Sequence, residues 1–287
     1  MTVPFLAMAT TRSSGSSRSL KLALLMLPAL LLFLFFFGIP IVRMLLLGLE
    51  GGFEQYEKAF DGAVYRQIFY LTFKVSLLVT AITFLLGYPV AYWLATTTTA
   101  WRAIGFALIL LPLWTSILVR TYAWMVLLGR NGIVNQLLIG LDVIETPIAF
   151  LYNFSGVLIG MVHVLLPFMI LPLYAAFRRL DPRLVEAAAG LGAGGWSILS
   201  RIYLPLTRSG IVAGCSLVFV TSIGFFITPA LLGGGRVMMI APLIDQQVRQ
   251  LLNWPFASAL AGILLVLTIV IYTVMNWSVE SGEARRP

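Results

Sequence analysis

The sequence predicts an all-α integral membrane protein with six membrane-spanning helices. Its 287 residues are 60% hydrophobic and only 10% charged, whereas a soluble domain carries about a quarter charged residues. The mean hydropathy is +0.98. A spanning helix needs about 20 mainly apolar residues, and six stretches reach that length: 20–47, 68–95, 103–128, 154–177, 210–232 and 257–278.

The first of these stretches has two interpretations. The apolar run Leu22 to Phe37 follows a Ser/Thr/Arg-rich opening, residues 1–19, which we expect to be a disordered cytoplasmic segment. Such a run also occurs in cleaved signal peptides. We predict a retained first helix, because no clear small-residue cleavage site follows it and because further spans come after it in the chain. The expected organisation is a transmembrane domain over 20–280 and a cytoplasmic tail over 281–287.

Basic residues predict the orientation. The net charge of +8 would suggest a nucleic-acid partner in a soluble protein, but here it fits basic cytoplasmic loops, because Lys and Arg stay inside. With both termini cytoplasmic, the excess lies inside, at Arg12, Arg18, Lys21, Arg102, Arg178, Arg179, Arg183, Arg201, Arg208, Arg285 and Arg286. The outer loops 131–141 and 236–252 are expected to form short interfacial helices, with ordinary loops as the alternative.

The cytoplasmic loop 178–209 carries the most specific pattern. Pro182 suits a helix start, since its missing N–H would be unpaired there. Gly192 lets the chain turn, and a second helix is expected from Trp196 to Tyr203, ending before Pro205. The result is a helix–turn–helix knob, with apolar side chains that we expect to be exposed and to need a partner: Leu184, Leu191 and Trp196.

Within this loop, Glu186-Ala187-Ala188 is followed by Gly192 and then by Ile202-Tyr203-Leu204-Pro205. This spacing resembles the "EAA" loop of the membrane subunits of binding-protein-dependent ABC importers. The resemblance implies the six-helix type I permease fold and a knob that couples to a separate ATPase. It assigns that coupling to Asp181, Glu186, Ala187, Ala188, Leu191, Gly192, Ile202, Leu204 and Pro205.

The resemblance extends over roughly residues 20–280. The strings Leu86–Trp93, Leu111–Ser116, Ile227–Gly234 and Asn253–Phe256 are most similar to the first permease subunit of spermidine/putrescine importers. Related permeases for other small solutes share many of them, so the same machine with another substrate is the alternative. The implied partners are an ATP-binding cassette ATPase dimer, a second homologous permease, an extracytoplasmic solute-binding protein and the bilayer.

We expect no cofactor on this chain. It has no Gly-x-x-x-x-Gly-Lys-[Ser/Thr] string to cradle a nucleotide, so ATP and Mg²⁺ would be used by the partner ATPase. Two other classes compete with this interpretation. A secondary transporter would normally need ionisable groups at mid-membrane, and an intramembrane enzyme would need a paired nucleophile and base or a metal cluster.

A polyamine path would have few carboxylates to use, because no Asp or Glu lies between Gly62 and Leu141 or between Ala187 and Ile244. Aromatic faces hold a cation at about 0.5–2 kcal/mol each. The candidate path residues are Trp114, Ser116, Tyr122, Thr228, Asp245 and Trp254. An aromatic belt at the membrane interface is the alternative for the tryptophans, and a solvated loop charge for Asp245.

Three polar residues inside the spans have open roles. Arg120 and Lys74 fall within or near the ends of spans, where a charge marks a function or snorkels to the surface. For Arg120 we favour snorkelling or a structural pair, and a gate is the alternative. His163, the single histidine, would be a proton relay or a polar packing contact within the bundle, which we favour.

Overall fold

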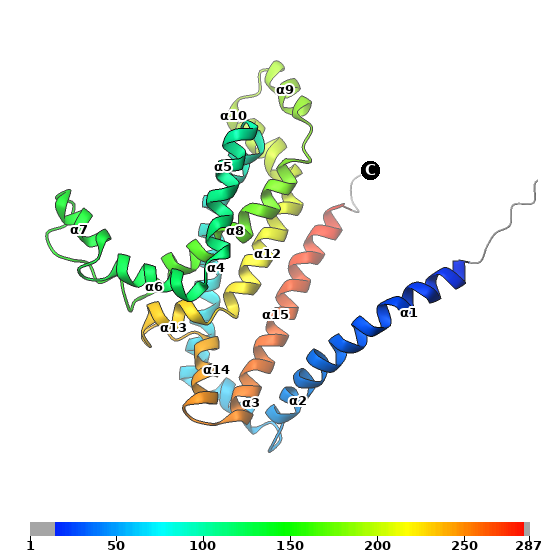
Figure 1. The fold of residues 1–287 in the computed structure, drawn as a ribbon, viewed down its shortest axis with the longest axis vertical. Coiled ribbons are helices and arrows are strands. Elements are labelled where there is room, and N and C mark those ends of the chain that lie inside the picture. The colour runs from blue at the N-terminus through cyan, green and yellow to red at the C-terminus, as the bar shows by residue number, and fades with distance from the viewer. Residues whose placement is uncertain (1–14, 284–287) are drawn as a thin grey trace, which may run out of the picture. The chain divides into compact units, whose positions relative to one another are not determined.

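The computed structural model describes residues 15–283, and its regular elements there are all helices. Most of the expected disordered segment and of the expected tail lies outside these residues. The chain divides into two units, one ending at Leu47 and one beginning at Gly48, and they are described separately (Figure 1).

The first unit holds the first predicted span. Helix α1 (Gly15–Phe33), a π-turn (Leu34–Gly38) and α2 (Ile39–Gly48) follow one another. Together they provide a stretch from Leu24 to Gly48 long and apolar enough to cross a membrane. The helix begins at Gly15 rather than at residue 20, so the end of the segment expected to be disordered is helical.

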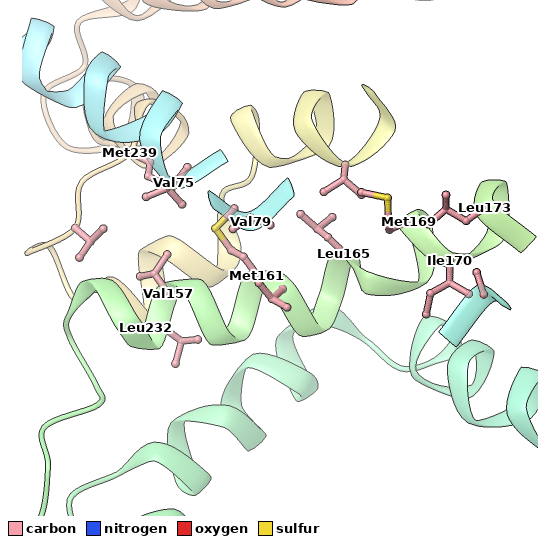
Figure 2. Close-up of a cluster of buried hydrophobic side chains, with 14 of the residues drawn as sticks. Val75, Val79, Val157, Met161, Leu165, Met169, Ile170, Leu173, Leu232 and Met239 are labelled. Atoms are coloured by element: carbon pink, nitrogen blue, oxygen red, sulfur yellow. The ribbon is translucent and has the colours of Figure 1, made fainter. Parts of the chain in front are cut away.

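Three long helices form the core of the second unit: α4 (Ala63–Thr96), α8 (Phe154–Phe177) and α12 (Arg208–Ile223). Figure 2 shows Val75 and Val79 of α4 beside Met161 and Leu165 of α8. In the most apolar 18-residue stretch of helix α8, 61% of the residues are buried. This helix therefore lies at the centre of this unit, although it contains Pro167 and Pro172, which neighbouring helices make tolerable in membrane helices.

Glycines bring these three helices into close contact. A Cβ at Gly210 of α12 would lie 2.4 Å from the Cβ of Ala176 and 2.9 Å from the carbonyl oxygen of Pro172. A Cβ at Gly214 would lie 2.8 Å from the sulfur of Met169, and one at Gly87 of α4 would lie 3.0 Å from the same side chain. Small residues at helix interfaces are typical of membrane bundles, and Gly210 and Gly214 serve this purpose here.

The third predicted span, 103–128, is broken rather than continuous. It consists of α5 (Thr99–Leu110), a 3-10 turn (Leu111–Trp114) and α6 (Ile117–Leu128). The segments Thr99–Trp114 and Ile117–Gly140 are bent by 101° relative to one another. Thr115 and Ser116 have extended backbones at the break. Pro112 has no N–H for the helical ladder, and the Thr115 hydroxyl donates a hydrogen bond to the Pro112 carbonyl at 2.8 Å.

The fifth predicted span, 210–232, is also interrupted. Helix α12 ends at Ile223, and α13 (Ile227–Gly233) follows after a break that begins at Gly224. The described residues hold four helices of membrane-spanning length. They hold up to six spans if two bent pairs each count as one, namely Thr99–Trp114 with Ile117–Gly140 and Gly195–Leu206 with Arg208–Ile223. The predicted all-α membrane class is confirmed. The prediction of continuous helices over 103–128 and 210–232 is wrong, because both stretches are interrupted.

Several segments predicted to share a side of the membrane also share an end of the second unit. The α4–α5 turn and helices α9 (Pro182–Gly190) and α10 (Gly195–Ile198) lie at one end in Figure 1. Helices α3 (Glu54–Asp61) and α14 (Ile240–Arg249) lie at the other, where α15 (Trp254–Glu283) begins. The helices predicted in the outer loops are confirmed as α7 (Ile133–Gly140) and α14.

Candidate functional site

Helix α9 begins where the sequence predicts. The Asp181 carboxylate accepts a hydrogen bond from the backbone N–H of Arg183 at 3.0 Å, and Pro182 occupies the first helical position. An aspartate at this position satisfies one of the unpaired N–H groups of the first turn and is worth about 1 kcal/mol. The structure therefore gives Asp181 a local role in starting the helix.

The turn at Gly192 and the second helix after it are found as predicted, except that the second helix does not end before Pro205. Gly192 has a φ of +83°, a conformation that glycine adopts without steric cost. Helix α10 then runs into a π-turn (Leu199–Tyr203) and α11 (Leu204–Leu206). Pro205 lies inside this helical run instead of after its end. The π-turn bonds the N–H of Leu204 to the carbonyl of Leu199, and the absent N–H of Pro205 leaves the ordinary ladder incomplete there.

The helix pair α9–α10 exposes apolar surface. Leu191 is 90% exposed, Trp196 78% and Leu184 50%, as the sequence predicts. Of the residues assigned to ATPase coupling, Ala188, Ile202 and Leu204 are half-buried, and the exposed ones are Asp181, Glu186, Ala187, Leu191, Gly192 and Pro205. Exposed apolar patches of this kind mark binding surfaces.

A cavity of about 440 Å³ lies under α9. Asp181, Val185 and Glu186 line it from α9 and its start, and Arg102 and Tyr92 line it from α5 and α4. Arg102 also donates hydrogen bonds to the carbonyls of Leu94 and Thr97 at the end of α4, at 3.1 and 2.7 Å. A cation at a helix C-terminus is favourable, so Arg102 fixes the α4–α5 turn beside the cavity.

Four aromatic residues connect the helix pair to the spans, and we call them the aromatic joint: Tyr88, Tyr92, Phe177 and Tyr203. The ring of Phe177 lies 5.0 Å from that of Tyr88, 5.7 Å from Tyr92 and 5.9 Å from Tyr203. Such edge-to-face pairs contribute about 0.5–1.5 kcal/mol each beyond their buried area. Burial raises the pKa of Tyr203 to about 12.

Sequence reasoning missed this joint. Its members come from α4, α8 and the π-turn before α12, and no local pattern links positions 88, 177 and 203. The only available signal was the excess of aromatic residues at the predicted cytoplasmic ends of the spans, which also suits an interfacial belt.

The candidate path residues fall into two groups. Trp114, 90% exposed, and Ser116 lie at the break of the third span, and Tyr122 follows on α6. Thr228 of α13 is fully buried, and its hydroxyl lies 3.4 Å from that of Thr121 on α6. This contact joins the two interrupted spans.

The other two path candidates lie elsewhere. Trp254 starts α15 and is 54% exposed. Asp245 of α14 pairs with Arg249 one turn later, with 2.6 Å between carboxylate oxygen and Nε. An exposed pair at this spacing contributes about 0.3–0.5 kcal/mol, so Asp245 carries a neutralised local charge here, next to α15 rather than next to the broken third span.

The polar residues of the spans have defined surroundings. His163 Nδ1 accepts a hydrogen bond from the Trp124 indole at 3.1 Å, which is the polar packing contact predicted for it. The Lys74 ammonium lies 5.6 Å from the centre of the Phe154 ring. Arg120 has Nε and Nη1 buried without a hydrogen-bond partner within residues 15–283, so no structural pair for it is found there.

Asn135 is a structural residue that the sequence did not single out. It is 1% exposed on α7. Its amide donates to the carbonyls of Gly129 and Ile148 at 3.1 and 2.9 Å and accepts from the N–H of Ile148 at 2.9 Å. A buried amide with these bonds organises the loop after α6.

This arrangement of membrane-length helices and a projecting helix pair agrees with the comparisons to known proteins. Residues 84–281 match the family described as "Binding-protein-dependent transport system inner membrane component". The chain belongs to this family and is a permease subunit of an ABC importer.

Two groups of relatives make the likeness more specific. The chain is 39% identical over 226 residues to the spermidine/putrescine transport system permease protein PotB of Haemophilus influenzae, covering 78% of this chain and 79% of that one. It is 35% identical to PotB of Escherichia coli, with 78% and 81% covered. The molybdenum transport system permease protein ModB of Azotobacter vinelandii is 30% identical over 62% of this chain and 74% of its own.

Among solved structures, the chain resembles one from a bacterial alginate ABC transporter in complex with an alginate pentasaccharide-bound periplasmic protein. The TM-score is 0.74 with 21% identity, and the match covers 91% of this chain and 94% of that one. At this identity the likeness concerns the fold, which is that of ABC importer permeases.

Proposed function

We propose that this permease imports polyamines such as spermidine and putrescine. The observation that carries the proposal is the 39% identity to a spermidine/putrescine permease over four-fifths of both chains. The exposed aromatic rings at the break of the third span support it, because Trp114 and Tyr122 offer faces for a cation in a region with few carboxylates.

The chain would work as one part of a larger importer. Its partners would be an ATPase dimer, a second homologous permease and an extracytoplasmic solute-binding protein. The α9–α10 pair would seat on the ATPase on the cytoplasmic side, with both termini on that side. Its exposed Leu191 and Trp196 support this placement, because such side chains require a partner surface.

ATP and Mg²⁺ would be bound by the ATPase and not by this chain. Closure of the ATPase dimer would shift the permease pair between inward- and outward-facing states, because ATP binds one arrangement more tightly than the other. The permease therefore supplies the pathway and the mechanical link, and the hydrolysis is done by its partner.

The test is uptake of labelled putrescine and spermidine by proteoliposomes that contain this chain, its second permease and ATPase, with the binding protein added. Uptake of either amine that requires ATP is the expected result. If other small solutes stimulate the ATPase but neither amine enters, the importer class stands and the polyamine assignment is wrong. Uptake that survives without the ATPase but collapses with an uncoupler would instead indicate a secondary transporter.

A further inference from the structure

Both ends of the α9–α10 pair connect to the spans, but only the second end crosses a bend between helices. On the α9 side, the chain leaves α8 through Leu180, whose N–H donates to the carbonyl of Phe177 at 3.1 Å. The 440 Å³ cavity lies between Val185 and Glu186 of α9 and the ends of the spans. On the other side, the π-turn and α11 lead directly into α12, and Tyr203 of the π-turn packs on Tyr92 and Phe177 at 5.2 and 5.9 Å. The second end therefore has aromatic contacts that could pass a displacement of the pair on to α4 and α8 as well as along the chain into α12.

Thr207 marks the point where that side meets the membrane bundle. It separates α11 from α12, and the helical segments before and after it are bent by 67°. Its side chain is fully buried, which is unusual for a polar residue unless its hydroxyl is hydrogen-bonded.

A short relay of hydrogen bonds crosses this bend. The Thr207 hydroxyl donates to the carbonyl of Tyr203 at 2.7 Å, so its single proton is used. The Tyr88 hydroxyl lies 3.2 Å from the same Thr207 oxygen and is therefore the donor in that bond. The phenol of α4 thus holds the end of the π-turn through Thr207, between residues 119 positions apart in the chain.

We propose that Tyr88 and Thr207 are positioning residues for energy coupling. Their hydrogen bond fixes the angle between α11 and α12, so that movement of the α9–α10 pair turns α12 and α4 together instead of flexing the bend. The aromatic joint supplies the packing around this bond, and the π-turn next to it supplies a helix segment of altered register, a feature frequent at functional sites. The inference rests on the proposed seating of the pair on an ATPase.

The test compares variants in the complete importer, reconstituted with both permeases, the ATPase and the binding protein. Tyr88→Phe and Thr207→Val each remove one hydroxyl and keep the shape, Thr207→Ser restores the hydroxyl, and Tyr70→Phe on the exposed face of α4 is the matched control. The readouts are uptake per ATP hydrolysed and the stimulation of ATPase activity by loaded binding protein, both per assembled complex.

Tyr88→Phe is expected to lower uptake per ATP about five-fold, the factor equivalent to the roughly 1 kcal/mol of one hydrogen bond. Thr207→Val should lower it at least as much, because it also removes the bond to the Tyr203 carbonyl. The double variant should be no worse than Thr207→Val alone, because that change already removes the bond to Tyr88, and Thr207→Ser should behave as the unmodified chain. Unchanged coupling in both single variants, or losses that only follow the amount of assembled complex, would overturn the inference. Failure of the unmodified importer to take up polyamine would instead refute the substrate proposal. The stimulation of ATPase activity would then still test the role of the Tyr88–Thr207 hydrogen bond.

Discussion

Glycine serves opposite purposes in two regions of this molecule. In the core of α4, α8 and α12, Gly87, Gly210 and Gly214 allow contacts that any Cβ would obstruct, at 2.4–3.0 Å from its nearest neighbour. In the α9–α10 pair, Gly190, Gly192, Gly194 and Gly195 have nothing within 4 Å of an added Cβ. The first set lets the helices of the bundle pack closely. The second set lies in an exposed segment where an added Cβ would contact no neighbouring residue.

The difference shows how one residue type supports two mechanical properties. Close helix contacts give the core extensive packing in lipid, where helices gain nothing from leaving water and association depends on packing and hydrogen bonds. The helix pair keeps its shape through local devices, namely the Asp181 cap and the positive φ of Gly192. We therefore expect substitutions in the core to change folding stability and those in the pair to change coupling.

The largest effect on stability is expected where the two regions meet. Phe177 is 6% exposed and contacts three tyrosine rings. Phe177→Ala removes these contacts and leaves a cavity, and Phe→Ala changes in cores cost about 3–5 kcal/mol. We expect the lower end, about 3 kcal/mol, because the membrane environment reduces the transfer contribution. Thermal unfolding in detergent measures this, with Phe53→Ala, at a 70% exposed ring, as the control. Equal melting temperatures for both variants would contradict a structural role of the joint.

A smaller but clear loss is expected inside the core. Gly210→Ala places a methyl group 2.4 Å from the Cβ of Ala176 and against the backbone of Pro172, and overpacking of this kind costs about 1–3 kcal/mol. The matched control is Gly190→Ala at the end of α9, where the space is open and alanine is the better helix former by up to about 1 kcal/mol. If both variants melt alike, close approach does not hold the core together.

The smallest effect on folding is expected in the turn of the helix pair. Gly192→Asp puts a side chain on a residue with φ +83°, a strain of about 1–2 kcal/mol, confined to an exposed turn. Membrane insertion should persist while ATP-driven uptake is lost, and Glu186→Lys on the exposed face of α9 should behave in the same way. Uptake assays with parallel measurement of ATPase recruitment check this. Normal uptake with normal recruitment would remove the coupling role of this pair.

Prediction from the sequence succeeded where local rules are sufficient. The start of α9 at Pro182 follows from the proline, and its exposed Leu191 follows from the helix–turn–helix pattern. It failed at Thr115–Ser116 and after Ile223, where two spans are interrupted. Hydropathy summed over about 20 residues is insensitive to such short breaks, which differ from a helix in backbone geometry and not in polarity.

The sequence by itself determined the class of the protein. A chain with this hydropathy must satisfy every backbone group inside helices, because the bilayer offers no water to bond them, and the spacing from Glu186 to Pro205 indicated the family. Only the tertiary structure decided which residues connect the helix pair to the bundle. Tyr88, Phe177 and Thr207 are brought together by the packing of α4, α8 and α12, and contacts between residues so far apart in the chain depend on how whole helices cross rather than on any local pattern.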